Sequence, residues 1–303
     1  MNTAWGYASG TFGELVQGEL EGRPFLITWP IRWGTRAVYQ ASDGDEVTVI
    51  PAHRKKAKMA AEALLRHWGL PTGGVLVIYS LLPVGKGMAS SSADIVAALR
   101  AVAHAYHRPL TPLLAARLAA SIEPTDGIMY PGVVAINPIT GQLLEKLGPV
   151  PKALVIGIIG HGRVNTEEQH LRRKPYHPDH QERLAKALGR ARQGLRQRDW
   201  REIGEASRIS AEVEAERRPD DRILKRVLGI AADEGWTPII AHTGTVRGFL
   251  FSEAAESIAL KRAESKLRAL DEGPVYRFVT ASGYFSTGGV IVPHANWPAP
   301  SHS

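Results

Sequence analysis

The stretch LLPVGKGMASSSADIVAALRA, Leu81–Ala101, joins a loop of small residues to an apolar helical pattern. The residues before it, GVLVIYS at 74–80, form an apolar run that predicts a strand. Ile95, Leu99 and Val102 recur at intervals of three or four residues and predict a helix. Glycines let a ligand approach the loop backbone, and a helix N-terminus points unpaired N–H groups and a positive dipole end at it. The stretch therefore predicts an anion site, most simply a phosphate site.

Three serines, Ser90–Ser92, stand where an N-cap and the first helical turn belong. A glycine turn closed by a serine cap, with no ligand, is the alternative interpretation. Walker-type phosphate loops end in Gly-Lys-Ser/Thr, and dinucleotide loops read G-x-G-x-x-G. The segment Gly85-Lys86-Gly87 fits neither pattern, because Lys86 lies between the glycines and not at the start of the helix.

A third known loop matches better. From Pro83, three residues lead to Gly87-Met88-Ala89-Ser90-Ser91, which resembles the Pro-x-x-x-Gly-Leu-Gly-Ser-Ser loop of the GHMP small-molecule kinases. Met88 stands in place of a leucine, and Ala89 in place of a glycine. The resemblance implies that the loop binds ATP through Pro83, Val84, Gly85, Lys86, Gly87, Met88, Ala89, Ser90, Ser91 and Ser92.

The composition sets broad limits on the chain. With 303 residues, 44% of them hydrophobic, it is long enough for one large or two modest globular domains. No run reaches the ~18 apolar residues of a membrane helix, and MNTAWGYASG lacks the features of a signal peptide. We therefore expect a soluble, cytoplasmic protein without a membrane partner. The absence of cysteine excludes disulfides, thiolate metal sites and cysteine nucleophiles.

The net charge of +7 leaves a second class of function open, because basic surfaces attract nucleic acid. The basic residues are spread along the chain, with one cluster, HRKKAK, at 53–58. Between residues 183 and 226, glutamates interleave with the arginines, which is typical of a solvated helix face. A nucleotide is also an anion, so the charge fits an ATP site as well. A basic nucleic-acid-binding module therefore stays as the alternative that the composition favours less.

The segment GTFGELVQG, Gly10–Gly18, is similar to the N-terminal signature of one GHMP branch, the L-threonine kinases of cobalamin biosynthesis. That signature typically reads Pro-Gly-Thr-Cys-Gly-Glu-Leu-Ile-Gln-Gly. Phe12 occupies the position of the cysteine, which argues against a chemically essential thiol there. The resemblance implies that Glu14 and Gln17 contact the substrate. From the residues alone, an exposed strand face is the favoured interpretation for both.

Two carboxylates follow the helix that Thr111 and Pro112 begin. Glu123 precedes Pro124, which stops the helix, and Asp126 lies three residues further on. Carboxylates are disfavoured at the negative end of a helix dipole, so a cation is one group that could hold them.

The GHMP pattern implies that Ser90 and Glu123 share the Mg²⁺ that accompanies ATP, which prefers oxygen ligands. Asp126 would accept the hydroxyl proton or orient the substrate's amino group. A simple cap on the Gly127 turn is the alternative role of Asp126.

The second half of the chain carries a third resemblance. HTGTVRGFLF, residues 242–251, is similar to the glycine-rich GHMP motif that lies close to the bound phosphates, and it implies a binding role for Thr243 and Gly244. A plain hairpin at Gly244 is the alternative. The residues after Gly160 would cover the substrate side in such a kinase, with Arg163, Asn165 and Thr166 able to meet a carboxylate. A solvated loop fits that segment better.

Strands and helices do not alternate strictly along the chain, which favours an α+β fold. Alternating residues 14–20 and 25–29 predict an N-terminal hairpin. The resemblance implies two abutting domains with ATP in the cleft, a ribosomal-protein-like domain at 1–150 and a ferredoxin-like domain at 151–303.

The function we expect is transfer of phosphate from ATP to the hydroxyl of L-threonine, giving O-phospho-L-threonine for cobalamin biosynthesis. Homoserine or an isoprenoid alcohol is the alternative acceptor. The oligomeric state is not indicated.

Overall fold

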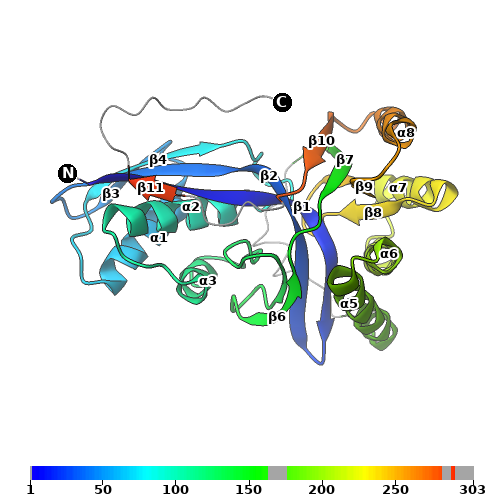
Figure 1. The fold of residues 1–303 in the computed structure, drawn as a ribbon, viewed down its shortest axis with the longest axis horizontal. Coiled ribbons are helices and arrows are strands. Elements are labelled where there is room, and N and C mark those ends of the chain that lie inside the picture. The colour runs from blue at the N-terminus through cyan, green and yellow to red at the C-terminus, as the bar shows by residue number, and fades with distance from the viewer. Residues whose placement is uncertain (1, 163–175, 282–287, 291–303) are drawn as a thin grey trace.

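A computed structural model describes residues 2–162, 176–281 and 288–290 of the chain (Figure 1). Its main sheet has the strand order β10-β7-β9-β8-β1-β2-β4-β3, with helices packed along it. The α+β class expected from the sequence is confirmed. Within the described ranges, none of the helices combines the length and apolar character that spanning a membrane requires. The residues Arg163, Asn165 and Thr166 lie outside the described part of the chain.

The first two strands form a long hairpin on which both halves of the sheet are built. β1 (Thr3–Leu20) pairs antiparallel with β2 (Arg23–Ala41) from one end to the other. Glu21 and Gly22 between them have positive φ angles of 51° and 72°, as a two-residue primed turn requires. The predicted strands at 14–20 and 25–29 were too short. Bulges in the register between residues 9 and 16 let the pairing continue through the glycines of β1.

One half of the sheet carries the loop quoted above. β4 (Gly74–Ser80) pairs antiparallel with β2, and β3 (Val47–Ile50) pairs parallel with β4. α1 (Lys55–His67), α2 (Ser90–Ala105) and α3 (Pro112–Ala120) lie on one side of these strands (Figure 1). The short β11 (Gly288–Val290) returns to pair with the start of β1.

α2 is the central helix of this half. It is buried almost along its whole length, and six of its sixteen residues are alanines that allow neighbouring backbones to approach. Gly6 on β1 makes the closest approach possible, because a Cβ there would lie 2.5 Å from the backbone of Ala97 and Ala101. The helix therefore holds its N-terminus in a fixed place relative to β1.

The other half continues the same sheet from β1. β7 (Ala153–Ile159), β8 (Thr237–Ile240), β9 (Val246–Ser252) and β10 (Val275–Val279) are all antiparallel to their neighbours. α5 (Pro178–Gln197), α6 (Trp200–Arg217), α7 (Arg222–Glu234) and α8 (Ser257–Arg268) flank these strands. β5 (Val133–Ile136) and β6 (Leu143–Gly148) form a small hairpin that joins β2 at Leu26.

The two halves share β1 and β2, so strands from before and after residue 150 belong to one sheet. The division into 1–150 and 151–303 stays a prediction.

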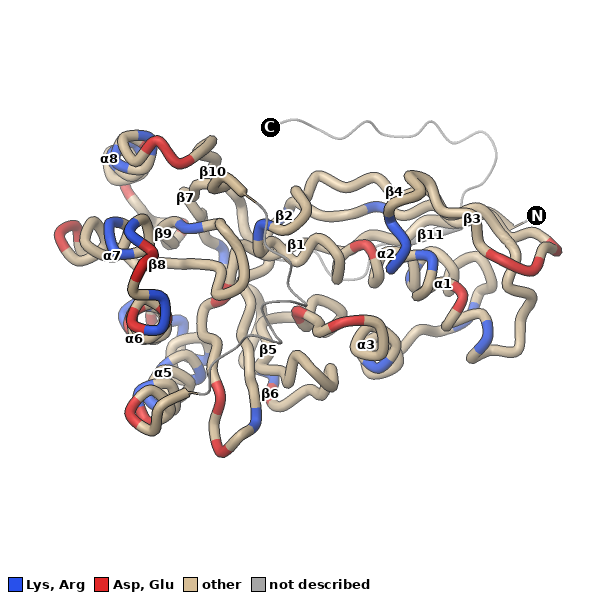
Figure 2. The backbone as a smooth tube through the Cα atoms, turned by 180° about the vertical axis from the view of Figure 1, so that it is seen from behind, with Lys and Arg blue, Asp and Glu red and all other residues tan. Residues whose placement is uncertain are grey.

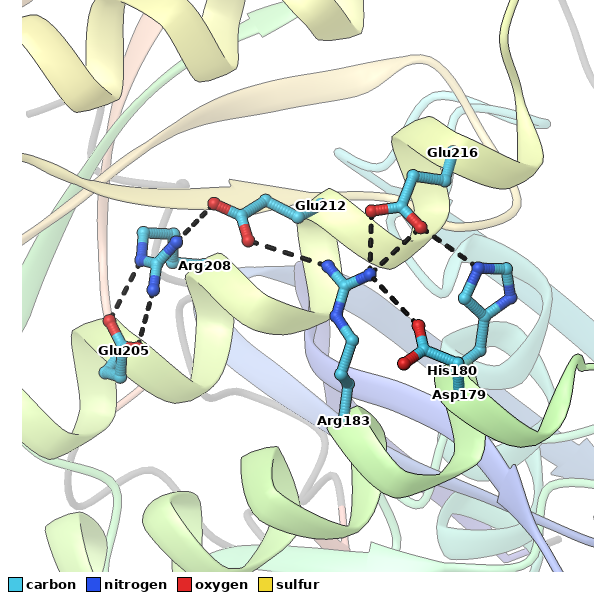
Figure 3. Close-up of polar contacts among 7 residues, drawn as sticks. All are labelled: Asp179, His180, Arg183, Glu205, Arg208, Glu212 and Glu216. Atoms are coloured by element: carbon cyan, nitrogen blue, oxygen red, sulfur yellow. Dashed lines mark hydrogen bonds and ion pairs between the residues drawn. The ribbon is translucent and has the colours of Figure 1, made fainter.

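The interleaved charges of the second half pair with one another on the helices. On α5 and α6, Arg183 contacts Asp179, Glu212 and Glu216, and Arg208 contacts Glu205 and Glu212 (Figure 3). Figure 2 shows basic and acidic segments side by side on α5 to α8. Much of the basic charge here is therefore balanced locally, as a solvated helix face requires, and forms no continuous basic stripe for a nucleic acid.

Candidate active site

A cavity of about 510 Å³ opens where the loop before α2 meets β1, the start of α1 and the turn after α3. It brings together residues that are far apart in the sequence. The predicted site residues that line it are Glu14, Gln17, all ten residues from Pro83 to Ser92, Glu123, Asp126 and Thr243. Gly244 does not line it but packs directly behind the loop.

The loop reaches the helix through three residues with positive φ: Gly85 at 73°, Gly87 at 81° and Ala89 at 56°. Ala89 is the N-cap of α2, and its side chain can cap nothing. Ser90–Ser92 are therefore the first three helical residues, and the expectation that a serine serves as N-cap was wrong. The N–H groups of this first turn receive no side-chain cap, which leaves the helix end suited to an anion from the cavity.

The third motif packs against this loop. The backbone N–H groups of Thr245 and Val246 donate to the carbonyl oxygen of Lys86 at 2.9 and 3.1 Å. A Cβ on Gly244 would lie 2.3 Å from that same oxygen, so only glycine fits between the two segments. The ammonium group of Lys86 donates to the carbonyls of Gly160, at 2.6 Å, and Gly162. Lys86 thus ties the loop to the end of β7 as well as lining the cavity.

The N-terminal motif supports the loop from the other side. The N–H of Thr11 donates to Met88 O at 3.2 Å, and the N–H of Gly13 donates to Gly87 O at 3.3 Å. Phe12 points away from the cavity into the core, where its ring centroid lies 5.0 Å from that of Phe278. The side chain at the position of the family's cysteine therefore has a packing role in this chain.

Glu14 is buried and held by the third motif. Its Oε2 accepts the backbone N–H of His242 at 2.7 Å, and the His242 ring Nδ1 lies 3.2 Å from the same oxygen. The other ring nitrogen of His242, Nε2, lies 3.0 Å from the hydroxyl of Ser210 on α6. The sequence analysis missed His242 and Ser210. The position of His242, at the start of the third motif, was the only local signal.

Asp126 lies beside Glu14 in the cavity wall. The Ser92 hydroxyl donates to Asp126 Oδ2 at 2.9 Å, and the Thr28 hydroxyl donates to the Asp126 carbonyl at 3.0 Å. Asp126 is partly accessible from the cavity but lies deep among protein atoms. Burial raises its pKa to about 7, the negative charges of Glu14 and Glu123 act in the same direction, and the Ser92 hydrogen bond opposes them. A carboxyl group with this pKa can take up or release a proton near neutral pH.

Glu123 is tied to the start of α1. Its Oε2 lies 2.6 Å from the ammonium nitrogen of Lys56, while its Oε1 is buried without a hydrogen-bond partner among the described residues. Ser90 and Glu123 line the same cavity. A carboxylate oxygen without a hydrogen-bond partner suits a hard cation such as Mg²⁺, which needs few protein ligands when phosphate oxygens supply the remaining ones. Within the described ranges, no group of three acidic or histidine side chains forms a separate metal site.

The basic cluster at 53–58, read from the sequence only as dispersed charge, is part of this cavity. His53, Arg54, Lys55 and Lys56 all line it. The Nη1 of Arg54 lies 2.5 Å from Asp94 Oδ2, and the Thr35 hydroxyl donates to Asp94 Oδ1 at 2.7 Å. Burial raises the pKa of Asp94, and the positive charge of Arg54 opposes that shift. The cavity is thus lined by basic side chains at 54–56, two of them paired with carboxylates, and by the acidic side chains Glu14 and Asp126.

Residues 55–132 match the family described as GHMP kinases N terminal domain. A curated L-threonine kinase of Salmonella typhimurium is 26% identical over 277 residues, which cover 88% of this chain and 90% of the relative. A homoserine kinase structure from Cytophaga hutchinsonii has a TM-score of 0.74 at 17% identity and covers 96% of this chain and 98% of its own. Streptococcus pneumoniae phosphomevalonate kinase, in complex with phosphomevalonate and AMPPNP, has a TM-score of 0.70 at 14% identity, with 92% and 100% covered.

Proposed function

We propose that this chain, which belongs to the GHMP kinase superfamily, transfers phosphate from ATP to the side-chain hydroxyl of L-threonine. The kinase class follows from the superfamily, whose members are small-molecule kinases that use ATP. Threonine as the acceptor rests on the L-threonine kinase relative and on the acidic side chains Glu14 and Asp126 of the cavity. A place in cobalamin biosynthesis is supported by the sequence signature alone.

The observation that carries the substrate class is the pair of carboxylates at Glu14 and Asp126. Glu14 is only 6% exposed, and its negative charge raises the pKa of Asp126. Two ionised groups facing one cavity repel each other, and either a proton on Asp126 or a cation between the two carboxylates relieves that repulsion. The ammonium group of an amino acid supplies that cation, whereas an isoprenoid alcohol supplies none. The pair therefore favours threonine or homoserine over mevalonate.

In this proposal ATP binds at the loop from Pro83 to Ser92 and the neighbouring start of α1. The uncapped N–H groups at the start of α2 and the cations at 53–56 suit the phosphates of ATP. Ser90 and Glu123 would hold Mg²⁺, which when bound offsets the negative charge that builds up on the phosphates during transfer.

In this proposal Asp126 receives the proton of the acceptor hydroxyl. Ser92 fixes its Oδ2, which leaves Oδ1 to receive the proton of the acceptor hydroxyl. As the new O–P bond forms and the bond to the leaving ADP breaks, that proton passes to Asp126 and then to solvent. Glu14 holds the ammonium group, and the backbone N–H of His242 keeps Glu14 in position. Catalysis of phosphoryl transfer depends mainly on such positioning and charge balance.

Coupled ADP release with threonine, serine, homoserine and mevalonate tests the proposal. We expect turnover with threonine to exceed that with homoserine, and none with mevalonate. Ser90→Ala should lose most turnover, while Asp220→Asn, which changes an exposed carboxylate in the turn between α6 and α7, should retain it.

Glu14→Gln tests the identity of the acceptor separately from the kinase class. We expect the KM for threonine to rise about tenfold or more with a smaller effect on the KM for ATP, because a charge-assisted contact is worth about 1.5 to 3 kcal/mol. Turnover with mevalonate in place of threonine would refute the acceptor and leave the kinase class standing. No ATP turnover with any alcohol would refute both.

A further inference from the structure

A second cavity, of about 310 Å³, lies between α2, α3 and the turn that follows Asp126. Its wall is mostly apolar and includes Ala103, Ala115 and Met129, all of them buried. Three basic side chains interrupt it: Arg100, His104 and Arg108. Arg100 and His104 lie four residues apart on α2 and so share one face of the helix, and Arg108 reaches the same cavity from the segment that follows the helix.

Arg100 is the innermost of the three. Its Nη1 donates to the carbonyl oxygen of Tyr7 at 2.6 Å, and no carboxylate in the described part of the chain forms an ion pair with it. Burial lowers the pKa of this guanidinium, which nevertheless remains charged at neutral pH. A buried charge without a counter-ion is unfavourable, so an anion in the cavity would stabilise it.

The other two basic groups are held in place at the mouth. The His104 ring Nδ1 lies 3.0 Å from the carbonyl oxygen of Trp5. Arg108 is exposed, its Nη1 donates to Trp68 O at 3.1 Å, and its guanidinium lies 5.6 Å from the centre of the Trp68 ring. A guanidinium has five N–H donors, and the carbonyl contacts of Arg100 and Arg108 use Nη1 in each case. The remaining donors can meet an oxyanion without a change in these contacts.

We propose that this second cavity binds a small organic anion, a carboxylate or phosphate ester with a short apolar body. Its oxyanion faces Arg100, His104 and Arg108, and its apolar part packs on Met129 and the alanines. The volume suits a molecule of a few carbon atoms and is at the lower end for small-molecule sites.

The position of this cavity links it to the first one. Met129, which lines it, lies in the same turn as Asp126, and α2 carries both Arg100 and the Ser92 that holds Asp126. We therefore expect an anion in the second cavity to alter the turn that carries Asp126, an effect that rests on the proposed function. We expect its binding to change the KM for the acceptor more than the KM for ATP.

The four methionines provide the readout. Met88 lines the first cavity and Met129 the second, whereas Met59 is about half exposed elsewhere on α1. The protein would be labelled with methyl-¹³C methionine, saturated with Mg²⁺ and a non-hydrolysable ATP analogue, and titrated with butyrate and, separately, with butyl phosphate. We expect the Met129 methyl signal to shift until the change saturates with probe concentration, while the Met88 methyl signal does not shift. The arm that saturates at lower concentration identifies the preferred oxyanion.

Two variants complete the test. Arg108→Ala removes an exposed side chain, so it should fold and keep its basal kinase rate, yet bind the probe about tenfold more weakly. Arg100→Met should abolish the Met129 shift. The proposal is overturned if neither probe moves Met129, if Met88 responds in its place, or if the Arg108→Ala protein binds both probes as the wild type does.

Discussion

The charge state of Asp126 leads to a prediction about stability. Its pKa is about 7 in the folded protein, against an ordinary value of 3.8. Below pH 4 the group is protonated in both the folded and the unfolded chain, and it has no effect. Between pH 4 and 7 the folded chain holds one more proton than the unfolded chain, so the free energy of unfolding decreases as the pH rises. Well above pH 7 Asp126 is ionised in both states, and the free energy of unfolding decreases no further on its account.

The size of the effect follows from the same two pKa values. Each pKa unit corresponds to about 1.36 kcal/mol, which gives an upper limit of about 4 kcal/mol above pH 7. Because Asp126 is partly accessible from the cavity, we expect about half of that. Asn has the same shape, accepts the Ser92 hydrogen bond and does not titrate. Asp126→Asn should therefore be more stable than the wild type at pH 8 and gain much less at pH 5, although it should lose kinase activity.

The assay is thermal unfolding without metal or nucleotide at pH 5 and pH 8. For a chain of 303 residues, about 2 kcal/mol corresponds to a rise in Tm of roughly 3 °C at pH 8. Asp220→Asn is the matched control, because it removes an exposed carboxylate and should leave the pH dependence unchanged. If Asp126→Asn and the wild type lost stability in parallel between pH 5 and pH 8, the assignment of a near-neutral pKa to Asp126 would be wrong.

Three further predictions concern the cavity and its supports. Glu123→Gln should raise the Mg²⁺ concentration needed for half-maximal ADP release and lower kcat about 100-fold, because it removes a charged oxygen ligand; an unchanged Mg²⁺ dependence would contradict that role. Gly244→Ala should destabilise the fold by about 2 kcal/mol or more, measured by urea unfolding, because its Cβ would lie 2.3 Å from a loop carbonyl. Gly229→Ala, whose Cβ meets nothing within 4 Å on helix α7, should instead stabilise by up to about 1 kcal/mol. Asp94→Ala should cost about 1 to 3 kcal/mol in urea unfolding, because it removes the carboxylate that pairs with the partly buried Arg54 guanidinium, and an unchanged stability would contradict a stabilising role of the pair.

The loop and the helix that follows it could be predicted from the sequence, because their conformation depends on residues that are neighbours in the chain. The loop from Pro83 to Ser92 needs small residues for positive φ and a helix that follows at once, and both are visible in the letters. The boundary was less exact, since Ala89 and not a serine is the N-cap. A left-handed residue at that point is set by how the loop packs on β1 and the third motif, which no local pattern reports.

The assembly of the site depended on contacts between distant segments. The resemblance identified Glu14, Glu123 and Asp126 one by one, but the mutual effect of Glu14 and Asp126 arises only when β1 and the turn after α3 wall one cavity. In the same way, the basic cluster at 53–58 looked like dispersed surface charge until the start of α1 was placed beside Glu123 and Asp94. His242 could be suspected only from its place at the start of the third motif, because its partner Glu14 lies 228 residues away in the chain. Ser210 gave no signal, because it reaches the site only through the ring of His242.

The sequence by itself indicated the α+β class through the order of its strands and helices, and its motifs resembled those of the GHMP kinases. Phosphate binding at the loop from Pro83 to Ser92 stays a prediction. The tertiary structure alone decided which charges face one another, which carboxyl group has a pKa near 7 and where the Phe12 side chain packs. The physical reason is that burial and Coulomb interactions depend on distance in space, and the β1–β2 hairpin shared by both halves sets those distances.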